Sequence, residues 1–190
     1  MNVAIRCSLA VLVTAACTLA GAANDRFFKE APGSMNGFMP VTDPLYTKEC
    51  GACHTAYLPG LLPARSWQLH MDLLHKHFGD NIALKPADHA AILKYLVDNA
   101  ADRSQYEGSL TIMERVDRKQ TPYRFQDMAL YREMHRIILE VIERKSKIKV
   151  RRLTNCGDCH QAADEGSFGN SELLIPGLTP TRKQYRTPVR

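Results

Sequence analysis

The sequence is 190 residues long, with 24% charged and 7% aromatic residues, a single tryptophan and a formal net charge of +5. A chain of this length is short for two domains, and so few aromatic side chains allow only a modest apolar core. After the first 23 residues no stretch is long and apolar enough to cross a membrane, and the charge excess is weak evidence for binding nucleic acid or a membrane surface.

Residues 1–23 have the pattern of a secretory signal peptide. A positive charge precedes a short apolar run, and the segment ends in small residues. The run is too short and wrongly flanked for a spanning helix, and we expect cleavage after Ala22 or Ala23. Lipid attachment at Cys17 is the alternative, although Thr14 stands where such a signal usually has leucine. The segment therefore predicts an exported protein.

Residues 24–41 are rich in glycine, proline, asparagine and methionine and show no periodicity, which predicts an irregular arm. A helix is expected next, with Thr42 or Asp43 as its N-cap and Pro44 in its first turn. This helix runs into the first copy of a motif that occurs twice in the chain.

The motif Cys-x-x-Cys-His occupies residues 50–54 and again residues 156–160. It is the attachment signature of c-type haem, in which two thiols form thioethers with the haem vinyl groups and the histidine ligates the iron. The two copies use every cysteine outside the first 23 residues. We therefore predict two covalently bound haem c groups. The residues expected to bind them are Cys50, Cys53, His54, Cys156, Cys159 and His160.

Three other interpretations of the cysteines remain. A redox-active Cys-x-x-Cys pair would sit in a βαβ pattern, which the sequence lacks. A single zinc site made from both pairs would usually have them closer together in the sequence, and two disulfides are the third possibility.

Two haems would also compensate for the small core and the positive charge. Buried porphyrins would add apolar volume, and their propionates would bring the formal net charge, +4 without the leader, close to zero. Because bacteria attach c-type haem outside the cytoplasm, the leader and the motifs together predict a periplasmic protein.

Two more helices are expected in the first lobe. An apolar, proline-containing loop follows the first motif, and a helix should run between Ser66 as its N-cap and Gly79 as its C-terminal stop. The next helix should begin at Pro86 and end at 99–101, packing back on the earlier helices. A helix that runs into Cys-x-x-Cys-His is how class I cytochromes c begin, so residues 42–101 are interpreted as a class I-like haem domain.

Residues 102–126 are charged and are interrupted by Gly108 and Pro122. We interpret them as the connection between two lobes, with residues 110–113 as a possible short extended piece.

A strong amphipathic helix is predicted from Asp127 onward. Its apolar stripe consists of Met128, Tyr131, Met134, His135, Ile138, Val141 and Ile142. It ends in a basic run, residues 144–152, directly before the second motif. Residues 127–177 are expected to form a smaller, partly irregular haem lobe, and residues 178–190 a mobile basic tail. The predicted fold is therefore mainly α, with a class I cytochrome c-like N-terminal lobe.

The second axial ligand of each iron decides whether a haem transfers electrons or binds ligands. Five histidines lie outside the motifs, namely His70, His75, His77, His89 and His135. A lone histidine on a helix is more often a surface or hydrogen-bonded residue than a ligand. His135 is the candidate for the second haem, because an unpaired imidazole on an apolar stripe would be costly to bury.

For the first haem we prefer His77, which stands where the helix is expected to end, and keep His75 and His70 as alternatives. His89 lies near a helix start and is expected to be exposed. Methionine also ligates class I cytochromes c, although a methionine on an apolar stripe is usually core packing. The weaker candidates are Met113, Met128 and Met134.

Beyond the two motifs, several segments resemble the bacterial dihaem cytochromes c. The likeness runs from about Tyr46 to Gly177. Its other pieces are Trp67 with Met71, residues 77–81, 95–96 and 133–137, Asn155, and residues 163–168 and 175–177. The chain differs from the family in the charged linker around 114–120, the extra histidines at 70, 75 and 89, and the basic tail.

The resemblance implies a class I-like first lobe, a second lobe with little regular structure, and two irons that each bind two histidines. It pairs His54 with His77 and His135 with His160, so the distal ligand of the second haem precedes its motif. It also suggests a monohaem, oxygen-binding cytochrome c and a membrane cytochrome b as redox partners.

The expected function is that of a periplasmic dihaem c-type cytochrome, an electron-transfer protein rather than an enzyme, with low-spin haems of low potential. The alternative is a small haem enzyme or ligand sensor with one labile or open distal position. A haem-stabilised docking subunit is a third class. Residues 144–152 are a candidate for steering an acidic partner to the second haem, although cations also suit a helix C-terminus and nearby propionates.

Overall fold

The structure is a computed structural model, and it describes residues 36–144, 154–169 and 172–175. The described part is mainly helical, as the sequence predicts, and contains no strand. Its helices are α1 (Pro44–Cys50), α2 (Ala64–Asp72), α3 (Pro86–Asp98), α4 (Glu107–Arg115) and α5 (Ala129–Arg144). None of these described helices is long and apolar enough to cross a membrane. The predicted leader, its cleavage site, the basic run after residue 144 and the C-terminal tail lie outside the described residues.

Helix α1 begins as the sequence predicts. The carboxylate of Asp43 accepts a hydrogen bond of 2.7 Å from the backbone N–H of Tyr46, and Pro44 occupies the first turn. The helix ends at Cys50, so its last residue is the first cysteine of the motif.

Helix α2 differs from its prediction at both ends. It begins at Ala64, directly after Pro63, because the carboxylate of Asp102 caps it from another part of the chain by accepting from the Ala64 N–H at 2.8 Å. Ser66, the predicted N-cap, is completely buried inside the helix. The helix ends at Asp72, where the chain tightens into a short 3₁₀ turn over Leu74–Lys76.

The centre of the hydrophobic core lies between α2, α3 and the loop that follows the first motif. Ile92 and Leu96 of α3 are at most 2% exposed and face Trp67 and Met71 of α2. The Trp67 indole N–H donates to the carbonyl of Pro59 at 2.7 Å, which fixes the buried loop against the helices. Helix α3 spans Pro86–Asp98, close to the predicted boundaries.

The predicted extended piece at 110–113 is wrong, because these residues belong to α4. Ile112 of α4 is completely buried, whereas Leu110 is 46% exposed, so the apolar residues follow a helical face rather than an alternating strand. The Ser109 hydroxyl donates to the carbonyl of Gly60 at 3.0 Å. Helix α4 thus packs on the core of the first lobe.

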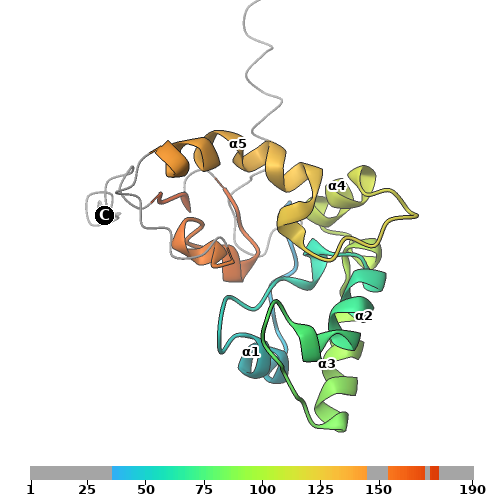
Figure 1. The fold of residues 1–190 in the computed structure, drawn as a ribbon. Coiled ribbons are helices and arrows are strands. Elements are labelled where there is room, and N and C mark those ends of the chain that lie inside the picture. Colours follow the sequence, from blue (N-terminus) through green and yellow to red (C-terminus); the bar gives the residue numbers. More distant parts are fainter. Residues whose placement is uncertain (1–35, 145–153, 170–171, 176–190) are drawn as a thin grey trace, which may run out of the picture.

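The described end of the arm ties α4 to the segment that follows the second motif. The backbone N–H of Phe38 donates to the carbonyl of Gly166 at 3.0 Å, and the N–H of Gly108 donates to the carbonyl of Gly37 at the same distance. Gly166 has a φ of +81°, and a Cβ there would lie 2.0 Å from the Phe38 carbonyl oxygen, so only glycine fits. Figure 1 shows α5 and the second motif at one end of the molecule and α1 to α3 at the other.

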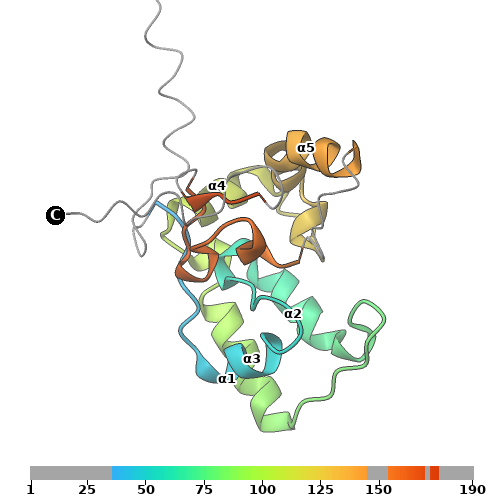
Figure 2. The ribbon, with the colours of Figure 1, turned by 90° about the vertical axis from the view of Figure 1, so that its left-hand side faces the viewer.

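Helix α5 runs along the edge of the molecule (Figure 2). Met128, just before the helix, and Tyr131 are buried, and His135 is half-buried. Met134 is 45% exposed and Ile137 is 68% exposed, so Met134 does not belong to the buried stripe.

Candidate haem sites

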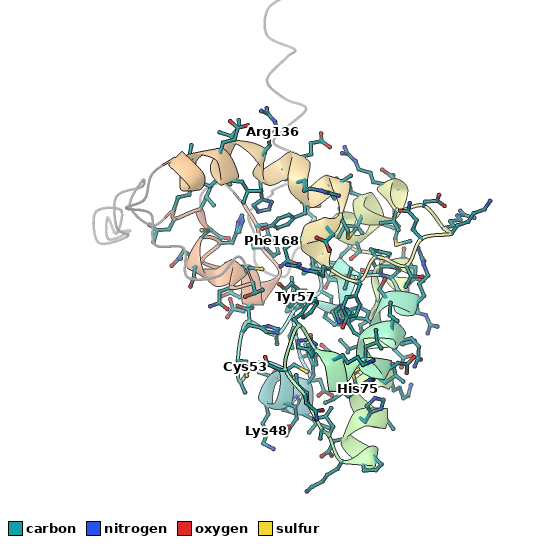
Figure 3. The ribbon with its side chains drawn as sticks, viewed as in Figure 1. Lys48, Cys53, Tyr57, His75, Arg136 and Phe168 are labelled. Carbon is teal, nitrogen blue, oxygen red and sulfur yellow. The ribbon has the colours of Figure 1, made fainter. Side chains whose placement is uncertain are left out.

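The first motif places Cys50 at the end of α1 and His54 in the turn that follows. Cys50 is half-buried and Cys53 is exposed (Figure 3). Nδ1 of His54 lies 2.7 Å from the carbonyl oxygen of Thr55. Since a carbonyl only accepts, this nitrogen carries the proton, and Nε2 is left as the potential metal ligand.

The ring of His77 faces the ring of His54. Their centroids are 6.1 Å apart and their planes differ by 18°. Burial, and then the nearby His54, lower the pKa of His77. Its Nδ1 is buried without a hydrogen-bond partner. The structure therefore brings together the two histidines that the family resemblance pairs.

A strained turn holds His77 in place. The N–H of Asp80 donates to the carbonyl of His77 at 2.9 Å, and the N–H of Ile82 donates to that of Leu74 at 3.0 Å. Phe78 has a φ of +50°, which is a rare conformation for a residue with a large side chain, and Gly79 follows at +104°. The turn directs His77 inward and leaves Phe78 53% exposed.

The other two candidate histidines for this site have different surroundings. His75 is exposed at the surface (Figure 3). The ring of His70 stacks on the ring of Tyr123, with centroids 4.3 Å apart and planes that differ by 19°. The centroid of the Trp67 ring lies 5.6 Å from that of His70. Burial lowers the pKa of His70 to about 4. His70 is thus a neutral part of an aromatic cluster, 6.2 Å from His77.

The remaining predicted candidates lie elsewhere in the described structure. The expectation that His89 is exposed is wrong, because it is half-buried and its Nε2 lies 3.1 Å from the carbonyl oxygen of Met71. Met128 is buried in the hydrophobic core, Met113 packs against that core, and Met134 is exposed.

The second motif begins in a 3₁₀ turn, Cys156–Asp158, and continues to His160. The N–H of His160 donates to the carbonyl of Cys156 at 2.8 Å. A short bridge pairs His160 with Leu173, and the ring of Phe168 lies 5.0 Å from the His160 ring. Little regular structure surrounds this motif, so its geometry depends on these individual contacts.

His135 of α5 faces His160. Their ring centroids are again 6.1 Å apart, but here the planes differ by 78°. Nδ1 of His135 lies 2.9 Å from the carbonyl oxygen of Tyr131, whose ring stacks on the imidazole at 4.0 Å. Burial lowers the pKa of His135, and burial together with His135 lowers the pKa of His160 to about 4. Both imidazoles are therefore neutral, as metal ligation requires.

The spacing of the two histidine pairs fits a metal ion between the rings. A metal–imidazole bond is about 2 Å long, as it is for zinc, which puts the ring centre about 3 Å from the metal. Two rings on opposite sides of one ion are then about 6 Å apart, and both observed pairs are separated by 6.1 Å.

The thiols also fit haem attachment better than the alternatives. Cys50, Cys53, Cys156 and Cys159 are all free, so neither motif closes a disulfide. Burial raises the pKa of Cys50 and of Cys156 to about 11, whereas a redox-active pair needs a thiol of lowered pKa. Within the described ranges no group of three or more His, Cys, Asp or Glu side chains could hold a metal ion, so the two pairs do not form one zinc site.

The two motifs lie next to each other across an open cavity of about 660 Å³. Its lining includes Cys53 and His54 of the first motif and Gly157 and Asp158 of the second. The sequence alone did not predict this adjacency, because His54 and Asn155, which also lines the cavity, lie 101 positions apart in the chain.

The sequence model of the dihaem cytochrome c family matches residues 46–168. The chain belongs to this family. Dihaem cytochromes c carry two covalently bound haem c groups, and membership indicates an electron-transfer cytochrome.

Solved structures of other dihaem cytochromes c resemble the chain. The diheme cytochrome c from Rhodobacter sphaeroides is 38% identical with a TM-score of 0.59, covering 68% of this chain and 99% of that one. The diheme cytochrome c from Shewanella baltica OS155 is 33% identical with a TM-score of 0.55, covering 70% of this chain and 93% of that one. No curated protein matches the sequence.

Proposed function

We propose that this dihaem cytochrome c is an exported, periplasmic electron carrier in which each iron is ligated by two histidines. His54 and His77 would ligate the first iron, and His160 and His135 the second. The thioethers would form at Cys50 and Cys53 and at Cys156 and Cys159. The observation that supports this assignment is the 6.1 Å separation of the facing rings in both pairs.

Bound haem supplies a one-electron iron couple, and two imidazole ligands per iron favour electron transfer over substrate binding. The protein contributes orientation. The backbone carbonyls of Thr55 and Tyr131 each hold one imidazole by its Nδ1 and aim its Nε2 away from the backbone. Burial keeps the other two rings neutral.

The partners we propose are other redox proteins, with no nucleic acid among them. The family resemblance makes a monohaem, oxygen-binding cytochrome c and a membrane cytochrome b the first candidates. The basic run 144–152, only the first residue of which is described, remains a proposed docking segment for an acidic partner.

The ligand assignment is tested by single substitutions in the haem-loaded protein. His77→Ala and His135→Ala should each turn one of the two haems high-spin, because each removes one axial ligand. His75→Ala is the matched control, since His75 is exposed on the same turn as His77, and it should leave both haems low-spin. The absorption spectrum of each purified variant measures the change.

Carbon monoxide distinguishes a carrier from an enzyme or ligand sensor. The reduced wild-type protein should not bind it, because both axial positions of each iron are taken. Stoichiometric binding by the wild type would contradict the carrier assignment and favour a labile distal ligand. A low-spin spectrum in His77→Ala would instead move the first ligand to His75 or His70.

A further inference from the structure

The segment directly after the first motif contacts the second motif. The backbone N–H of Thr55 donates a hydrogen bond of 3.2 Å to Oδ1 of Asn155. Thr55 follows His54 in the chain, and Asn155 precedes Cys156. One hydrogen bond therefore connects a neighbour of the first proposed iron ligand with a neighbour of the second haem-attachment cysteine.

Two residues further on, Tyr57 lies between the two motif-bearing parts of the molecule (Figure 3). Its ring meets the ring of His54 edge-on, with centroids 5.5 Å apart and planes 77° apart. The Tyr46 hydroxyl donates to the Tyr57 carbonyl at 2.8 Å, and the side-chain amide of Gln126 donates to the Tyr57 hydroxyl. These bonds fix both the backbone and the ring of Tyr57.

Tyr57 also lies near groups of the second site. Burial raises the pKa of Tyr57 to about 12, and the nearby Cys156 thiol and Tyr131 phenol contribute to this increase. Tyr131 in turn stacks on His135 at 4.0 Å. Tyr57 is thus in contact with His54 and close to two groups that belong to the second haem site.

We propose that Tyr57 and Asn155 are positioning residues that fix the separation and orientation of the two haem sites and thereby set the rate of electron exchange between them. This inference rests on the proposed function. The exchange oxidises one iron by one electron and reduces the other by one electron. No bond is made or broken, and no proton is transferred.

The experiment compares variants of the haem-loaded protein at half-reduction. Nuclear magnetic resonance saturation transfer between haem methyl signals gives the exchange rate, and extrapolation to zero protein concentration isolates its intramolecular part. Tyr57→Leu and Asn155→Leu should each lower this rate by about tenfold, because transfer between fixed groups falls steeply with misplacement. Tyr57→Phe keeps the ring and should retain most of the intramolecular exchange rate of the wild type. Tyr106→Leu, at the start of α4, is the control and should exchange as the wild type does.

A second readout does not depend on electron transfer. Amide hydrogen exchange at Thr55 should become about fivefold to tenfold faster in Asn155→Leu, because its N–H loses an acceptor. Unchanged protection of this amide would overturn the role of Asn155, and an unchanged intramolecular rate in Tyr57→Leu would overturn that of Tyr57. If the wild type itself shows a high-spin haem or no intramolecular exchange, the proposed function fails along with this inference.

Discussion

At the scale of residues, the site consists of imidazoles that burial keeps neutral. His77, His135 and His160 have lowered pKa values for this reason, and we propose all three as iron ligands. His70 is half-buried and its pKa is lowered in the same way, but it stacks on Tyr123 and is not among the proposed ligands. It is therefore a half-buried histidine that can still titrate when haem is bound.

His70 should make the stability of the protein depend on pH. Its pKa is about 4 in the folded protein and 6.5 in the unfolded chain, so below pH 6.5 the unfolded state binds the extra proton. The contribution of His70 to the free energy of unfolding is fully present above pH 6.5. It is lost as the pH drops from 6.5 towards 4, and the loss amounts to at most about 3 kcal/mol.

Urea unfolding at pH 7 and pH 5 measures this effect. His70→Phe should preserve the aromatic packing and lose less stability than the wild type between the two pH values. The matched substitution at the exposed His75, His75→Gln, should leave the pH dependence as it is. Equal pH dependence in the wild type and His70→Phe would show that His70 does not carry it.

At the scale of elements, the sequence predicted α1, α3 and α5 well because each has a clear start signal and apolar period. It placed α2 too late because the cap comes from Asp102, which is 38 residues away and invisible to a local pattern. It also missed the helical character of α4, since a charged segment with a glycine resembles a connection. Glycine is needed at position 108 because the Phe38 ring occupies the space that a Cβ would fill.

At the haem sites, too, the sequence predicted the residues that have a local signal and missed those that depend on distant contacts. His77 and His135 were predicted from their place in the sequence pattern and from family resemblance, and the structure brings each close to a motif histidine. Tyr57 and Asn155 were not singled out as bridging residues, because their role depends on contacts with residues at least 69 positions away. Local patterns contain no signal for such contacts.

Helix α4 should stabilise the first lobe rather than simply connect two lobes. Ile112→Ala removes a completely buried side chain and should lower the free energy of unfolding by about 2–5 kcal/mol. Leu110→Ala on the exposed side of the same helix should change it by less than about 1 kcal/mol. Urea unfolding of the haem-loaded variants compares them, and similar small losses would mean that α4 contributes little.

At the scale of the whole molecule, the parts that carry the two motifs are connected at several separate places. The arm joins α4 to Gly166, Thr55 bonds to Asn155, and the Tyr57 hydroxyl accepts from Gln126. An electron carrier with two fixed sites requires that the lobes keep one arrangement. These connections supply it without a large continuous interface between regular elements.

We expect the two lobes to unfold in one cooperative step because of these connections. Trp67 fluorescence reports on the first lobe, and hydrogen exchange at Leu174, whose N–H donates to the Cys159 carbonyl at 2.7 Å, reports on the second. In the wild type both probes should give the same free energy of opening. Phe38→Ala removes the ring that lies 5.5 Å from Phe168 and should lower the Leu174 value by about 2 kcal/mol more than the Trp67 value, because the arm then keeps its backbone hydrogen bonds but loses its ring contact beside the second motif. Ile137→Ala, on the exposed face of α5, should lower neither of these two free energies of opening. Different free energies for the two probes in the wild type would show that the lobes open independently and that the arm does not couple them.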